Sequence, residues 1–217
     1  MNTRTFRFRR TALAVAAAGV LPLALSACSG DSGNSSSKAA DTSSSTAASK
    51  ATPSGTMTAD QPFGSACSAV PKNGAGSFDG MAQDPVATAA SHNPVLSTLV
   101  SAVKKAGLVD TLNNAQNITV FAPTNDAFAK IPKAQLDKVL NDKAELTKIL
   151  TYHVVGERLT PKDLEHRSFT TLEKGKVTTS GSGTSYTVDD SAKVVCGNVK
   201  TANATVYIID SVLMPKN

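Results

Sequence analysis

The sequence predicts an α+β fold with a largely antiparallel sheet, and two observations lead to this prediction. Between residues 81 and 165, apolar side chains recur mostly at helical spacing. From Phe169 onward, short runs rich in valine, isoleucine, threonine and tyrosine are separated by turn residues. Helices that come early and strands that come late are typical of α+β proteins, whereas parallel α/β proteins alternate the two.

The first predicted helices follow cap signals. Asp84 and Pro85 begin a short helix that runs through Ala90. Asn93 and the proline after it are typical of an N-cap and a first helical position, and Gly107 is typical of a helix end. Apolar residues recur at helical spacing between these two signals: Leu96, Leu99, Val100 and Val103.

Cap residues and the spacing of apolar residues also predict the elements that follow. Val109 and Leu112 lead into a buried strand at residues 118–121, which closes at Ala122 and Pro123. A helical turn begins at Thr124 or Asn125, a helix follows Pro132, and another holds Leu146, Ile149 and Leu150. Further predicted elements are a strand within residues 152–156, a short capped helix at 160–164, and strands at 176–179, 185–188, 193–196 and 205–209.

The N-terminus has the features of an export signal. Four arginines precede an uncharged apolar run at residues 11–24, and residues 25–28, LSAC, follow. Small residues before a cysteine mark a lipoprotein cleavage site, so we expect Cys28 to become the N-terminus and to carry a lipid. The alternative is an ordinary secretory signal with an incidental cysteine. A membrane-spanning helix is disfavoured because the run is short and Pro22 interrupts it.

Composition then divides the chain into four segments. Residues 1–27 form the signal, and residues 28–60 form a tether rich in serine, threonine and alanine that buries too little apolar surface to fold. Residues 61–80 are expected to form an arm with little regular structure, and residues 81–217 the folded domain. No period of 20–50 residues repeats, so we expect a single folded unit.

Net charge excludes one class of partner. The chain has 22 basic and 17 acidic residues, a net charge of +5. Four of the basic residues are arginines of the signal, so 18 basic residues remain against 17 acidic ones, a net charge of +1. A mature chain so close to neutral has no electrostatic footprint for nucleic acid.

The small numbers of cysteines and histidines limit which catalytic or metal sites the chain can form. After Cys28, only Cys67 and Cys196 remain, and in an exported protein they either pair or stay as two separate thiols. The three histidines are too widely spaced for a zinc pair. We therefore predict no catalytic residues, no metal site and no cofactor. The candidate binding residues are Tyr152 and His153. We interpret this pair either as a buried structural pair or as part of a binding face.

Three motifs give the chain a resemblance to a known family. Residues 119–128 (TVFAPTNDAF), the Tyr-His pair within residues 149–155 (ILTYHVV), and residues 204–215 (ATVYIIDSVLMP) resemble, in order, the motifs of the fasciclin, or FAS1, domain. The resemblance implies a β-wedge with helices packed around it, and a role in adhesion and extracellular binding. Residues 80–87 and 192–214 also resemble one bacterial subgroup, the immunogenic secreted or lipid-anchored fasciclin antigens of mycobacteria and their actinobacterial relatives. This resemblance implies a disulfide between Cys67 and Cys196.

These inferences lead to two main hypotheses about function, and a hydrolase of the envelope is a third, disfavoured one. The first is a non-enzymatic surface protein, lipid-anchored to the outer face of the cell membrane or released, that binds an extracellular or envelope macromolecule, either protein or polysaccharide. The second is an exported carrier or sensor of a small apolar ligand. An apolar pocket of several hundred cubic ångström would favour the second, and a solid wedge with an exposed apolar patch the first. We expect a monomer in both cases.

Overall fold

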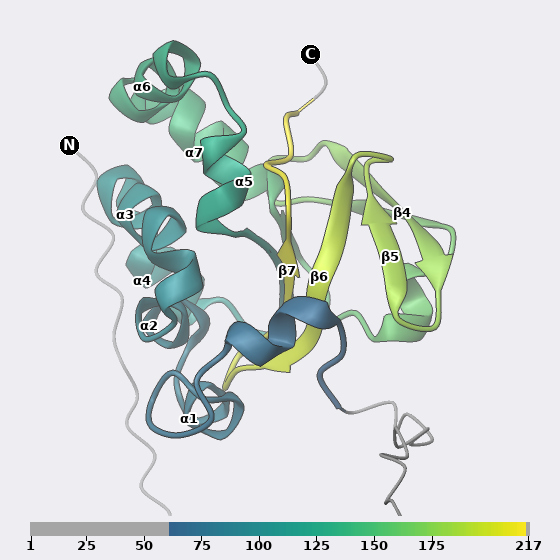
Figure 1. The fold of residues 1–217 in the computed structure, drawn as a ribbon. Coiled ribbons are helices and arrows are strands. Elements are labelled where there is room, and N and C mark those ends of the chain that lie inside the picture. The colour runs from purple at the N-terminus through teal and green to yellow at the C-terminus, as the bar shows by residue number, and fades with distance from the viewer. Residues whose placement is uncertain (1–60, 216–217) are drawn as a thin grey trace, which may run out of the picture. The chain divides into compact units, whose positions relative to one another are not determined.

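The computed structural model describes residues 61–215, in which most of the helices lie on one side of a seven-stranded sheet (Figure 1). The described helices are η1 (Ser65–Ala69), α1 (Phe78–Gln83), α2 (Val86–Ser91), η2 (Pro94–Leu96), α3 (Ser97–Ala106), α4 (Val109–Asn114), α5 (Asn125–Ala129), α6 (Lys133–Asn141), α7 (Lys143–Tyr152) and η3 (Pro161–Leu164). The described strands are β1 (Ile118–Pro123), β2 (Val154–Val155), β3 (Arg167–Thr170), β4 (Lys176–Ser182), β5 (Ser185–Val188), β6 (Ala192–Lys200) and β7 (Ala204–Ile209). The predicted α+β class is confirmed.

The sheet is antiparallel except at one pair of strands. Its order is β2-β1-β7-β6-β5-β4-β3, and β1 runs parallel to β7, in a register from Ile118 opposite Ala204 to Pro123 opposite Ile209. All other neighbouring strands are antiparallel. The last strand of the chain therefore lies inside the sheet, between β1 and β6.

Both faces of the central strands are buried, and they face two different cores. In β7, Val206 and Ile208 pack against the helices, while Tyr207 and Ile209 point into a second core. That second core also holds residues of β3, β4 and β5, so the sheet curls until its two halves share one apolar interior. Successive side chains of a strand point to opposite faces, which explains why all six residues of β7 are buried.

Strand β6 connects the two halves of the curled sheet. It pairs with β5 through Ala192 and Lys193 and with β7 from Val194 to Lys200. Its register with β7 shifts twice, and Asn198 has a positive φ of 59°. Such bulges bend a strand and increase its twist, so β6 can belong to both halves.

The structure differs from the prediction at three segments, one of which is β3 at Arg167–Thr170, a strand that the sequence did not predict. Residues 61–80 were expected to have little regular structure, but η1 forms there and α1 begins at Phe78, because the Ser77 hydroxyl accepts a hydrogen bond from the Gly80 N–H at 3.1 Å. Residues 109–114 were expected only to approach a strand and instead form α4, which buries Leu112. No helix within the described residues is long and apolar enough to cross a membrane.

Candidate functional site

His153 lies at the C-terminal end of α7, and only 2% of its surface is exposed. Its Nδ1 is 2.8 Å from the Ile149 carbonyl oxygen, and its Nε2 accepts a hydrogen bond from the Leu213 N–H at 3.0 Å. A carbonyl can only accept and an N–H can only donate, so the imidazole is neutral with its proton on Nδ1. Burial lowers the pKa of His153 to about 4, against the opposing effect of the Ile149 carbonyl.

Tyr152 joins the same turn to the far half of the sheet. Its hydroxyl lies 2.8 Å from the Lys176 carbonyl oxygen and 2.8 Å from the Asp189 carboxylate. Burial, reinforced by the bond to Asp189, raises the pKa of the Tyr152 phenol. Asp189 also accepts from the Thr178 N–H at 2.9 Å, so one carboxylate links α7, β4 and the turn after β5.

The side chains of this pair are therefore not available at the surface, but two of their neighbours are. The Leu213 N–H is bound to His153, which places Met214 next to the turn. The Leu172 N–H donates to the Val154 carbonyl oxygen at 2.8 Å. Leu172 and Met214 are the exposed large apolar residues of the described chain, with exposed fractions of 41% and 46%.

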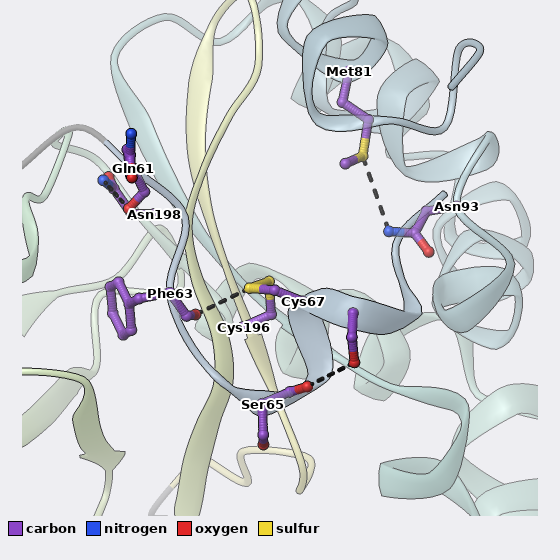
Figure 2. The surroundings of a disulfide bond; sticks show 9 residues. Gln61, Phe63, Ser65, Cys67, Met81, Asn93, Cys196 and Asn198 are labelled. Atoms are coloured by element: carbon purple, nitrogen blue, oxygen red, sulfur yellow. Dashed lines mark hydrogen bonds between the residues drawn. A yellow bond between two sulfur atoms is a disulfide. The ribbon is translucent and has the colours of Figure 1, made fainter. Parts of the chain in front are cut away.

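Cys67 and Cys196 form a disulfide with a Cα–Cα distance of 4.9 Å, which attaches η1 to β6 (Figure 2). Phe63 adds two backbone hydrogen bonds to Gly197, of 3.1 Å and 2.7 Å. A side chain at Gly197 would collide with the Phe63 ring. The dashed line at Cys67 in Figure 2 marks a 3.0 Å approach of its sulfur to the Phe63 carbonyl oxygen; a disulfide sulfur has no proton to donate.

An apolar cavity of about 160 Å³ lies between the helices α2, α3 and α4 and the inner strands of the sheet. Asn203 fixes the helices at its border, because its amide accepts from the Val86 N–H and donates to the Leu112 and Ala115 carbonyl oxygens. The lining is mostly apolar, as represented by Val86, Leu96, Leu99, Val103, Val109, Leu112, Val120, Leu150, Val154, Val199, Val206 and Ile208. It includes one buried amide, Asn93, and one lysine, Lys104.

The structure brings together few of the groups that catalysis or metal binding needs. Within residues 61–215 no group of three or more histidine, cysteine, aspartate or glutamate side chains could hold a metal ion. His92 lies 3.4 Å from Asp84, away from the buried His153, and His166 is exposed. Cys28, the predicted lipid attachment site, lies outside the described residues.

The comparisons with known proteins settle the family. The sequence model of the fasciclin domain matches residues 94–215. The chain belongs to the fasciclin family. The fasciclin domain here is 51% identical over 147 residues to the immunogenic protein MPB70 of Mycobacterium bovis, covering 65% of this chain and 75% of that protein. It is 50% identical over 147 residues to the cell surface glycolipoprotein MPB83 of the same species, covering 65% of this chain and 66% of that protein.

A solved structure supports the fold of this fasciclin domain. It is a FAS1 domain pair from the insect cell adhesion molecule fasciclin I, with a TM-score of 0.51 and 21% identity over 62% of this chain. The fasciclin domain described here spans about half of that structure, 52% of its length. At this identity the likeness establishes the fold and nothing about the partner.

Proposed function

We propose that this protein is a non-enzymatic, lipid-anchored surface protein whose fasciclin domain binds an extracellular or envelope macromolecule. The observation that carries the proposal is the 50% identity to a cell surface glycolipoprotein, which extends over 147 residues. The signal and the LSAC sequence at residues 25–28 support attachment through Cys28 to the outer face of the cell membrane. The near-neutral mature chain supports a protein or polysaccharide partner over nucleic acid.

The geometry of the histidine supports binding over catalysis. A general base needs a ring nitrogen that can reach a substrate proton. Both ring nitrogens of His153 are bonded to backbone groups, and its side chain is buried. The Tyr152 hydroxyl is likewise held by a carbonyl and a carboxylate. The proposed role of the pair is to shape the surface next to it.

That surface is where we place the macromolecular partner. The Leu172 N–H donates to the Val154 carbonyl oxygen, and Leu213, the residue before Met214, donates its N–H to the His153 ring. Leu172 and Met214 are both exposed. Exposed apolar side chains on a rigid backbone are suited to burial at a protein interface, where they contribute without being ordered first. The surface residues beside Tyr152 and His153 are therefore the proposed binding site.

The test is a capture experiment with the mature, unlipidated chain against envelope and matrix extracts. The double variant Leu172→Ser, Met214→Ser should bind the captured partner about fivefold or more weakly, with an unchanged melting temperature because both side chains are exposed. Lys72→Ser, an exposed change in the arm, is the matched control and should bind normally. Equal binding by the double variant and wild type would place the interface elsewhere.

A second candidate function is that of a carrier or sensor of a small apolar ligand, for which the apolar cavity is the candidate site. Its volume of about 160 Å³ is below the several hundred cubic ångström of typical drug-sized sites, so the cargo would be small. Native mass spectrometry of protein purified from its own cells tests this candidate. A bound small molecule released by organic solvent supports it, and an empty protein under gentle ionisation speaks against it.

A further inference from the structure

Asn93 is an unusual residue in the wall of the apolar cavity. It precedes η2, only 1% of its surface is exposed, and it lines the cavity together with Met81. Its side-chain oxygen accepts a hydrogen bond from the Val95 N–H at 3.1 Å, which fixes the orientation of the amide. The amide nitrogen, Nδ2, is therefore the end that remains for other partners.

The Asn93 nitrogen has almost no partner within the described chain. Its one hydrogen-bond contact is with the Met81 sulfur, at 3.9 Å. Figure 2 draws this contact as a dashed line and shows the Met81 side chain pointing at the amide. A thioether is a weak acceptor, and the amide nitrogen has two N–H groups to donate. A buried donor left without a good acceptor costs free energy, so native structures seldom keep one without a reason.

The other buried polar groups of the wall are already occupied. Both ring nitrogens of His153 bond to backbone. The Thr201 hydroxyl accepts from the Ala204 N–H at 3.0 Å and lies 3.2 Å from the Ala204 carbonyl oxygen. Among the buried polar groups of this mostly apolar wall, the Asn93 amide nitrogen is thus the donor that can still make a strong hydrogen bond.

The size of the cavity limits what such a donor can meet. A cavity of about 150 Å³ lined by leucine, isoleucine and phenylalanine stays dry and binds benzene. The present cavity, at about 160 Å³, has the same scale and a similar lining. Binding sites for small molecules typically combine such a lining with a few polar groups that fix orientation.

We propose that this cavity binds a small apolar molecule, about the size of a substituted benzene ring, through a carbonyl oxygen that accepts a hydrogen bond from Asn93 Nδ2. The inference rests on the second candidate function, because it requires the cavity to hold a ligand. It adds the chemical class of that ligand, a ketone, ester or amide, and names the residue that selects it.

The test compares two probes of nearly the same shape. Acetophenone carries a carbonyl oxygen where isopropylbenzene carries a methyl group. Both are titrated into the mature protein, and binding is followed by the NMR shifts of the Val103 and Val206 methyl groups, which line the cavity. Because water solvates the ketone better, the informative quantity is the ratio of the two Kd values in each variant.

Two variants isolate the hydrogen bond. Asn93→Ser removes the amide donor but keeps a side-chain oxygen at the N-cap, and it should weaken acetophenone relative to isopropylbenzene by about fivefold. Met81→Leu removes the sulfur at nearly constant volume and should leave the ratio unchanged. A measurement on the wild type needs no variant: the infrared carbonyl frequency of bound acetophenone should fall below its value in an aprotic solvent.

The possible outcomes separate the proposed hydrogen bond from ligand binding in general. A ratio that changes only in Asn93→Ser, with a lowered carbonyl frequency, supports the inference. Binding of both probes with an unchanged ratio and an unshifted carbonyl overturns it and leaves an apolar ligand site standing. Binding of isopropylbenzene alone also overturns it. If neither probe moves the cavity methyl signals, the inference fails, while the second candidate function is decided by native mass spectrometry and the proposed surface role is unaffected.

Discussion

At the scale of single residues, His153 does its work as a neutral hydrogen-bonding group. It closes the end of α7 through Ile149 and holds the C-terminal segment through Leu213. The unfolded chain, by contrast, exposes an imidazole with an ordinary pKa of 6.5. The difference makes folding stability depend on pH.

We predict that the free energy of unfolding falls as the pH drops from 6.5 to about 4. In this range the unfolded state binds a proton at His153 that the folded state does not, so stability rises with pH and is fully present above pH 6.5. The change amounts to about 3 kcal/mol, from 1.36 kcal/mol per pKa unit. Urea unfolding at several pH values measures it.

The matched variant is His153→Asn, whose amide can still donate to the Ile149 carbonyl but does not titrate. It should be less stable at neutral pH because the Leu213 N–H loses its acceptor. Its stability should fall less steeply than that of wild type between pH 6.5 and 4. Parallel pH profiles for the two proteins would mean that the imidazole is not held neutral.

At the scale of elements, the arm depends on one covalent link. The Cys67–Cys196 bond spans 129 residues of sequence and joins η1 to β6. Apart from it, the first residues of the arm are held by the backbone bonds between Phe63 and Gly197, by the bond from the Asn198 amide to the Gln61 carbonyl oxygen, and by burial of the Phe63 ring in the second core. These bonds are few, so the arm should open before the core does.

We predict that the double variant Cys67→Ser, Cys196→Ser is less stable by about 2–4 kcal/mol, because the unfolded chain is no longer cross-linked. Hydrogen exchange should increase first at residues 61–80 and only later in β1 and β7. Reduction of the wild type is the parallel measurement and should give the same exchange pattern. Protection of the arm that equals that of the central strands in the reduced protein would contradict this order.

The sequence predicted local features of these elements better than distant pairings. Asn93 as an N-cap and Gly107 as a helix end are both present, because caps depend on a few neighbouring residues. Of the two caps suggested for α5, Thr124 is the one that accepts from the Ala127 N–H. Asn125 instead accepts from the Thr98 N–H, a contact across 27 residues that no local pattern indicates.

The candidate site was predictable only in part for the same reason. The sequence singled out Tyr152 and His153, and burial was among the interpretations given for them. It gave no sign that Asp189, which is 37 residues away, holds the Tyr152 hydroxyl. The cavity could not be predicted from the sequence either. Its wall comes from helices and strands whose apolar residues look like ordinary core residues, and these elements meet only in the fold.

At the scale of the whole molecule, the folded domain is proposed to work at the end of a lipid-anchored tether. The segment between Cys28 and the domain is rich in serine and threonine and poor in bulky apolar residues. Such a segment has no affinity of its own for a bilayer. In the proposed arrangement, attachment to the membrane therefore depends on a lipid at Cys28.

We predict that Cys28→Ala abolishes membrane association and releases the protein in soluble form. Membrane fractionation of cells that express the variant measures this. The double variant Cys67→Ser, Cys196→Ser is the matched control and should remain with the membranes, because those cysteines lie outside the LSAC sequence. A Cys28→Ala chain that still sediments quantitatively with membranes would refute lipid attachment at this residue.

The link between arm and sheet also decides how the domain bears load. In the proposed tethered state, tension from a bound partner would enter the described domain at Gln61, meet the Phe63–Gly197 backbone bonds and reach the disulfide within seven residues. There it passes to β6, a strand with hydrogen-bonded neighbours on both sides. The helices that line the cavity are outside this line of force. In the proposed anchored state, the disulfide would carry tension from the tether to the sheet, and its loss would pass that tension to α1 and α2, which follow the arm in the chain.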